Sequence, residues 1–511
     1  MTASGGRSLG LVAFSCVLAT LLHAIDSTIV SVALPHIQGT LQATQDQAAW
    51  VATAYIVAAA IMTPLSGWLG VRFGLRPVLL SAIVGFTICS MLCGVASSIG
   101  QLVLFRALQG GLGAALVPLS QVVLMQEFPR EKYLRVVAIW ATASLLGPVI
   151  GPTLGGYLTD TLSWRWAFYI NLPIGLLAWA TMSINLPRRE IDPGRPFDIS
   201  GFVLLSLAVG LLQLMLDRGE TADWFESTEI VAEGFFAATF FYMFIAHALT
   251  TRHPFVDIHM FRDRNFTICL FIHTAFGAFI TSPSVLLPTY LQQLQGYTPT
   301  QAGMLMASRG ASAVVGMFAA GHLPRGLDVR APMITGVLAV AGGLMVMSHF
   351  TADTPASWFV GCGIVLGLGM PLTYVPIQVV AYATLPVASR TEAGVVQRLG
   401  VNIGGAVGIS LMVAQLARSA QANQAYFAEL FTPYATDRLQ AIGGVPAADA
   451  QTAQMVGEVG RQALAIAYAN DFFLLGATCL VCVPLILLLR RAPVVDTPAD
   501  GTAEATAEVA H

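Results

Sequence analysis

The chain contains fourteen stretches of about 20 mostly apolar residues, and this feature limits its fold more than any other. A helix needs roughly 20 apolar residues to cross the hydrocarbon core of a bilayer. Hydrophobic residues make up 56% of the chain and charged residues only 10%, whereas a soluble domain carries about a quarter charged residues. We therefore predict an all-α polytopic membrane protein. The predicted spans are 11–33, 48–70, 77–97, 100–125, 135–158, 165–186, 200–216, 228–249, 266–290, 300–322, 331–350, 356–380, 392–416 and 470–489.

The placement of the cationic residues predicts the orientation of these spans. Most of the 25 arginine and lysine residues fall in alternate short loops, such as those holding Arg72 and Arg76 or Arg325 and Arg330. Loops that hold an excess of arginine and lysine normally face the cytoplasm. An even number of spans with both termini in the cytoplasm satisfies this pattern.

An internal repeat predicts two related halves. Residues 67–76 (GWLGVRFGLR) and 321–330 (GHLPRGLDVR) both place glycine first, leucine third and arginine tenth. Repeated halves with a binding site at their interface are typical of secondary transporters. The predicted division is 1–186 for a six-helix half, 187–265 for two inserted helices, 266–493 for the second half with an outward-facing segment 417–468, and 494–511 for a disordered tail.

Several other classes of protein are disfavoured by the sequence. All seven cysteines fall within predicted spans, so neither disulfides nor a metal site is expected. The chain has no HExxH, Gly-x-Ser-x-Gly or P-loop pattern, which argues against an enzyme and against ATP as energy source. The net charge of −3, without a basic tract, gives no sign of nucleic-acid binding. We expect no cofactor.

Asp26 and Arg106 are charged residues inside predicted spans. An ionised carboxylate at such depth costs several kcal/mol unless it is paired or neutralised. At 1.5 Å per residue, Asp26 lies roughly 12 Å and Arg106 roughly 10 Å from the outer ends of their helices, so an ion pair is sterically allowed. The pair is either a proton-coupling site, in which Asp26 carries the proton, or a structural lock between helices.

Other polar residues within the spans are candidates for the lining of a substrate cavity, although packing or bonding to neighbouring carbonyls is an equal alternative for each. Arg309 and Arg398 have no acid at helical pairing distance, and His23 has a repeat mate in His273. The full set of cavity candidates is His23, Tyr55, Gln109, Arg309, Tyr374 and Arg398.

Five fragments resemble the major facilitator superfamily, in particular its fourteen-helix drug:proton antiporters and the EmrB-type multidrug exporters among them. The fragments cover nearly the whole chain. They are IDSTIVSVALP (25–35), GWLGVRFGLR (67–76), FRALQGGLGAALVPLSQ (105–121), GPVIGPTLGGYL (147–158) and WRWAFYINLPIG (164–175).

The resemblance implies roles for two groups of residues. The gating loop would contain Gly67, Arg72, Gly74 and Arg76, and its usual fifth-position Asp is replaced by Val71. That replacement puts in doubt the charge relay usually drawn through this Asp. The antiporter helix would contain Gly147, Pro148, Gly151, Pro152 and Gly155. Glycines every four residues allow helices to approach closely, so plain packing is the alternative to a kinetic role.

The resemblance also implies a function. It predicts a proton-coupled antiporter in the bacterial inner membrane that exports amphipathic or hydrophobic drugs by alternating access, driven by the proton gradient. The implied partners are a periplasmic adaptor and an outer-membrane channel. A symporter or an exporter of one metabolite on the same fold is the main alternative, because fold alone does not settle the direction of transport.

Overall fold

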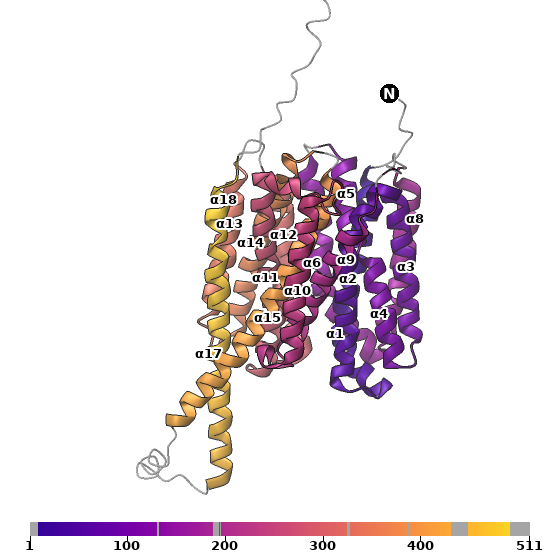
Figure 1. Ribbon diagram of the computed structural model, residues 1–511. Helices are drawn as coiled ribbons and strands as arrows, with labels where there is room; N and C mark the ends of the chain where they lie inside the picture. The colour runs from indigo at the N-terminus through magenta and orange to yellow at the C-terminus, as the bar shows by residue number, and fades with distance from the viewer. Residues whose placement is uncertain are drawn as a thin grey trace, which may run out of the picture.

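The structure is a computed structural model that describes residues 9–129, 132–187, 194, 196–323, 328–386, 389–430 and 448–490. In these residues the regular elements are all helices (Figure 1). The long helices that form the bundle are α1 (Leu9–Leu41), α2 (Gln45–Phe73), α3 (Leu75–Val95), α4 (Ile99–Gly113), α5 (Leu116–Glu127), α6 (Tyr133–Thr161), α8 (Asn171–Asn185), α9 (Ile199–Arg218), α10 (Thr228–Thr250), α11 (Arg264–Gln293), α12 (Pro299–Gly321), α13 (Arg330–Met347), α14 (Ala356–Ala383), α15 (Arg390–Leu430) and α17 (Ala448–Leu480). Short helices are α7 (Trp166–Tyr169), α18 (Cys482–Leu487) and the 3-10 turns η2 (Trp224–Glu226) and η3 (Ile258–Arg262).

The predicted spans fall on these helices. Thirteen helical segments of the described residues are long and apolar enough to cross a membrane, with α4 and α5 together forming one of them. The fourteenth predicted span, 135–158, falls on α6, a helix of 29 residues that packs lengthwise against α1 and α12. The prediction of a polytopic all-helical membrane protein is therefore confirmed.

The helices form two groups joined by the inserted pair. In the first group α1 packs against α6 and α8, and α2 packs against α4. In the second group α11 packs against α15, and α12 packs against α14. Between them in the chain, α9 and α10 pack on each other, and α9 also contacts both α2 and α15 (Figure 1). The inserted pair therefore touches both groups of helices.

The helices on either side of the predicted outward-facing segment 417–468 extend beyond the two predicted spans that flank it. Helix α15 continues to Leu430, and α17 begins at Ala448, well before the predicted start of the last span at 470. Both helices project beyond the rest of the bundle (Figure 1). The reason is that alanine and glutamine are good helix formers, so the helix continues after hydropathy has fallen. Residues 431–447 and the predicted tail 494–511 lie outside the described residues.

Side-chain hydrogen bonds join the two groups of helices at one end of the bundle. We call this the Arg-rich end, because the end of α2 and the starts of α3, α6 and α13 lie there with the start of α1 (Figure 1) and carry Arg72, Arg76, Arg135 and Arg330. Gln121 of α5 donates from Nε2 to Oε1 of Gln378 in α14, at 2.6 Å. Arg135 of α6 and His322 at the end of α12 approach to 2.7 Å. Among the described residues, these are the side-chain hydrogen bonds that join α1–α8 to α11–α18, so the bundle is closed toward the Arg-rich end.

The connection between α2 and α3 depends on Gly74. Its backbone φ is 91°, a conformation that residues with a Cβ rarely adopt. Close by, a Cβ on Gly67 would lie 3.1 Å from Cγ2 of Val395 in α15. The glycines of this loop therefore allow both a tight reversal of the chain and close contact between the two groups of helices.

Candidate functional site

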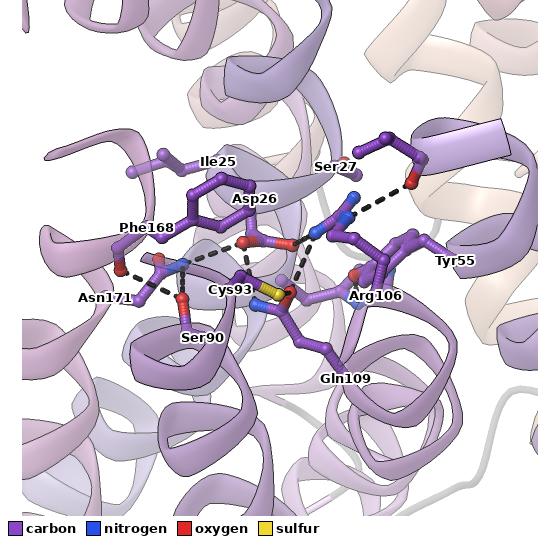
Figure 2. A network of polar contacts seen from close by, with 12 residues as sticks. Ile25, Asp26, Ser27, Tyr55, Ser90, Cys93, Arg106, Gln109, Phe168 and Asn171 are labelled. Atoms are coloured by element: carbon purple, nitrogen blue, oxygen red, sulfur yellow. Dashed lines mark hydrogen bonds and ion pairs between the residues drawn. The ribbon is translucent and has the colours of Figure 1, made fainter. Parts of the chain in front are cut away.

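A buried polar network surrounds Asp26, halfway along α1 (Figure 2). Asp26 is 0% exposed, and Arg106 of α4 is 1% exposed. The Nη1 atom of Arg106 lies 2.7 Å from Oδ2 of Asp26, which makes a buried ion pair. The depth estimate from the sequence therefore placed these two residues correctly with respect to each other.

Two amides complete the shell of the carboxylate. Gln109 donates from Nε2 to Oδ1 of Asp26 at 2.8 Å, and Asn171 of α8 donates from Nδ2 to the same oxygen at 2.7 Å. Arg106 also donates from Nη1 to Oε1 of Gln109, at 2.8 Å. Asp26 thus accepts hydrogen bonds from three side chains on two other helices. Both oxygens of the buried carboxylate are therefore hydrogen-bonded.

The network continues outward on two sides. On the α3 side, Ser90 receives a hydrogen bond from Asn171 at 2.8 Å and donates to the carbonyl of Phe168 (Figure 2). On the α2 side, Arg106 donates from Nε to the carbonyl of Val51, and its guanidinium lies 4.0 Å from the centroid of the Tyr55 ring. A cation over an aromatic face is a stabilising contact when both are desolvated.

His23 adjoins this network through Tyr55. The hydroxyl of Tyr55 lies 2.9 Å from Nδ1 of His23. Tyr55 is 2% exposed, so of the predicted cavity residues, Tyr55 and Gln109 are enclosed in protein in this conformation. Their polar atoms serve the Asp26 network and its neighbour His23.

Helix α6 packs directly on the helix that carries Asp26. A Cβ on Gly147 would lie 2.6 Å from the carbonyl carbon of Ala24, and one on Gly155 would lie 2.7 Å from Cγ1 of Ile29. A Cβ on Gly151 would overlap the hydroxyl of Thr28. Thr28 in turn donates to the carbonyl of Gly147 at 3.1 Å. The predicted close approach of α6 is therefore present, against α1 on both sides of Asp26.

The two prolines of the antiporter fragment do not interrupt α6. Pro148 and Pro152 both lie within its continuous helix of 29 residues. Their side chains are outside the part of the chain that the structure describes.

Of the gating-loop residues, Arg76 has a defined partner. Its Nη2 donates to the carbonyl of Ser183, in the last turn of α8, at 2.5 Å. Positive groups at the carboxyl end of a helix are favourable. Arg76 therefore bonds the end of a neighbouring helix within the first group. Arg72, in the last turn of α2, is half-buried.

The remaining cavity candidates lie in the second group of helices. Arg309 of α12 donates to the carbonyl of Ile280 at 3.1 Å and to the hydroxyl of Ser284 at 3.3 Å, so α11 satisfies much of its guanidinium. Arg398 of α15 is half-buried. Tyr374 of α14 is 8% exposed and packs edge-on against His273, with ring centroids 5.0 Å apart. These residues are not part of the Asp26 network.

Sequence reasoning missed Asn171 and Asp471. Asn171 lies in the fragment WRWAFYINLPIG, where an asparagine within an apolar run was the available signal. The structure shows that Asn171 is fully buried. Asp471 of α17 is also 0% exposed, and both of its carboxylate oxygens are buried without a hydrogen-bond partner among the described residues. Asp471 was missed because the last span was started at residue 470, which left this acid at an apparent helix end.

Comparison with known proteins decides the family. The sequence pattern of the Major Facilitator Superfamily matches residues 16–409. The chain belongs to the Major Facilitator Superfamily. The fold agrees, because the human organic anion transporter TETRAN superposes with a TM-score of 0.60 at 13% sequence identity, covering 95% of this chain and 100% of that chain.

Relatives with higher identity are resistance exporters of the same superfamily. The chain is 33% identical to the fatty acid resistance protein FarB of Neisseria gonorrhoeae, over 96% of this chain and 97% of the relative. It is 32% identical to the multidrug export protein EmrB of Escherichia coli strain K12, over 92% and 93%. The resemblance to EmrB-type exporters is thus confirmed, and this member of the superfamily is a multi-pass membrane transporter.

Proposed function

We propose that this transporter exports amphipathic and hydrophobic compounds in exchange for protons, and that Asp26 carries the proton. The observation that carries the proposal is the Asp26 site: a fully buried carboxylate paired with Arg106 at 2.7 Å. An ionisable residue inside a membrane protein is by default a functional candidate. The names of the relatives, fatty acid resistance and multidrug export, favour substrates of this class.

Proton binding at Asp26 would weaken the network. All three neighbours donate to the carboxylate, and a neutral carboxyl group accepts hydrogen bonds more weakly than an ionised one. Arg106 would then be able to withdraw from Asp26. Because Arg106 rests on Tyr55 and bonds Val51, both in α2, its withdrawal moves contacts on a second helix.

Helix α2 connects this site to the interface between the two groups of helices. It packs against α4 on one side and α15 on the other. Near the Arg-rich end, Gly67 and Gly70 of α2 lie against Val395 and Thr391 of α15. A movement of Arg106 therefore changes contacts of α2, and α2 also contacts α15 near the Arg-rich end. Alternating access needs such a link between the charge of the proton site and the contacts that open and close the bundle.

The orientation is the second part of the proposal. Cationic loops favour the cytoplasmic side, so the Arg-rich end is assigned to the cytoplasm, with both termini there. The conformation described is then closed toward the cytoplasm by the Gln121–Gln378 and Arg135–His322 bonds. The projecting ends of α15 and α17 lie on the opposite side, where a periplasmic adaptor leading to an outer-membrane channel would bind.

Efflux measured with and without an uncoupler tests the function. Cells that express the protein are loaded with a panel of amphipathic dyes and drugs, and accumulation is followed before and after the proton gradient is collapsed. The proposal expects lower accumulation in expressing cells and loss of this difference with the uncoupler while ATP is maintained. Efflux that persists under the uncoupler contradicts proton exchange. Greater accumulation in expressing cells would indicate a symporter.

A further inference from the structure

Arg398 differs from the other two cations within the spans in having no partner. Arg106 is paired with Asp26, and Arg309 donates to Ile280 and Ser284 of α11. Arg398 makes no hydrogen bond or ion pair with any residue that the structure describes, and it is half-buried. A half-buried guanidinium without a partner among the described residues is available to an acceptor from outside the chain.

Arg398 makes no ion pair with an acid among the described residues. It lies on α15, which packs against α2 of the first group of helices and α11 of the second. The charge of Arg398 acts on His23 and Tyr55 of the first group and on His273 and Tyr374 of the second. Arg398 therefore lies between the two groups of helices, near two histidine–tyrosine pairs. None of these four side chains carries a negative charge at neutral pH.

A second polar group in this region also lacks a partner. Gln378 donates from Nε2 to Nε2 of His273 at 3.2 Å, so the ring proton of a neutral His273 is on Nδ1. That Nδ1 atom is buried and has no hydrogen-bond partner among the described residues, and His273 is 1% exposed. Buried donors without acceptors are uncommon in proteins. Two unmatched donors in one region indicate that an acceptor enters from outside the chain.

We propose that Arg398 binds the carboxylate of an anionic amphipathic substrate between the two groups of helices. The inference rests on the proposed export function and names the substrate class that the central site prefers. A planar guanidinium binds a carboxylate through two parallel hydrogen bonds. The charges of Arg398 and Arg106 both act on Tyr55, so the bound anion would lie near the proton site.

The test compares two ligands that differ only in charge. The full chain is reconstituted in nanodiscs of zwitterionic lipid, and binding of 2-naphthoate and of 2-naphthamide is measured by fluorescence, with empty nanodiscs as background. Wild-type protein is expected to bind the carboxylate at least tenfold more tightly than the amide, roughly the strength of a charge-assisted hydrogen bond. Arg398→Gln is expected to lose that preference while binding of the amide changes less than about twofold.

Two further variants control for fold and for charge. Arg418→Gln removes an exposed arginine from the same helix, α15, and should leave both affinities unchanged. Arg398→Lys keeps the charge without the two parallel bonds, and should keep part of the preference. An Arg398→Gln variant that binds both ligands like wild type, or loses both equally, overturns the inference.

A lipid competition experiment shows whether the anion bound at Arg398 is a substrate or a lipid headgroup. Anionic lipid is added to the nanodiscs, and displacement of naphthoate is compared in wild type and Arg398→Gln. Equal displacement in both proteins would show that the lipid does not bind at Arg398. Displacement only in wild type would assign the site to a lipid headgroup and overturn the substrate assignment. Uncoupler-sensitive efflux of a neutral dye is measured in the same variants. Efflux without carboxylate preference defeats this inference alone, whereas absence of efflux in wild type defeats the proposed function.

Discussion

Asp26 and Arg106 form an ion pair of 2.7 Å between α1 and α4, and neither side chain reaches solvent. The pair does not stand alone, because Gln109 and Asn171 donate to the same carboxylate. Such an arrangement gives the buried carboxylate a counter-charge and hydrogen bonds on both of its oxygens. It joins α1 to α4 and α8 through side-chain contacts.

Replacement of Asp26 by asparagine should abolish uncoupler-sensitive efflux while the protein still folds and inserts in the membrane. Asparagine has nearly the same size, but it carries no titratable proton. We expect at least a tenfold loss of efflux rate at matched expression, and a lower unfolding temperature, because Arg106 loses its counter-charge. The matched control is Asp26→Glu, which keeps the carboxylate and should retain part of the activity. Normal proton-dependent efflux by Asp26→Asn would remove Asp26 from the mechanism.

The variant Arg106→Gln should be less stable than the double variant that lacks both the Arg106 and the Asp26 charge. The single change leaves Asp26 buried without its counter-charge, which costs about 3–5 kcal/mol in comparable buried pairs. The double variant Asp26→Asn with Arg106→Gln removes this penalty and should recover much of the unfolding temperature. A cycle of thermal unfolding measurements on the two single variants and the double variant checks this. Additive effects would show that the two residues are energetically independent.

Replacement of Asn171 by alanine should lower the stability of the protein. The change removes one hydrogen bond to Oδ1 of Asp26 and one to the hydroxyl of Ser90, and loss of one partner of a buried hydrogen bond costs about 1–3 kcal/mol. Thermal unfolding of the purified protein measures this loss. Ser90→Ala is the control, since Ser90 bonds Asn171 but not Asp26, and a smaller loss is expected. An unfolding temperature equal to that of wild type would contradict the assigned role of Asn171.

Replacement of Gly151 by alanine should lower both stability and efflux. The added methyl group would overlap the Thr28 hydroxyl and lie 3.3 Å from the carbonyl oxygen of Ile25, so α1 must shift next to Asp26. Overpacking of this kind costs about 1–3 kcal/mol. Gly156→Ala is the matched control on the same helix, because its Cβ would meet only Cγ1 of Val32 at 3.7 Å. Equal unfolding temperatures for the two variants would show that the α1–α6 contact tolerates the methyl group.

Replacement of Asp471 by asparagine should leave efflux and stability near wild type. Both oxygens of Asp471 are buried without a partner in the described part of the chain, so no hydrogen bond or ion pair there depends on its negative charge. An uncharged amide of the same size therefore replaces it with little change, within about 1 kcal/mol. The measurements are thermal unfolding and dye efflux. A loss of efflux without a loss of stability would identify Asp471 as a second proton-binding site.

Much of the architecture was accessible from local sequence properties. Hydropathy alone gave the spans, because a bilayer accepts only apolar helices of nearly fixed length. Spacing also placed Asp26 and Arg106 at a common depth, since the rise per residue of a helix is constant. The ends of α15 and α17 were not predicted, because helices continue past the membrane wherever the residues favour helix, as at Leu430 and Ala448.

The sequence by itself determined that this chain spans a membrane as a bundle of helices and that it carries an acid and three arginines within the bundle. Only the tertiary structure decided which of these arginines has a partner. Arg106 forms an ion pair with Asp26, and Arg309 donates hydrogen bonds to α11. Arg398 forms no hydrogen bond or ion pair with a residue that the structure describes. The physical reason is that depth depends on one helix at a time. Pairing depends on the rotation and packing of several helices, and residues such as Asn171 join a site only when α8 is placed beside α1.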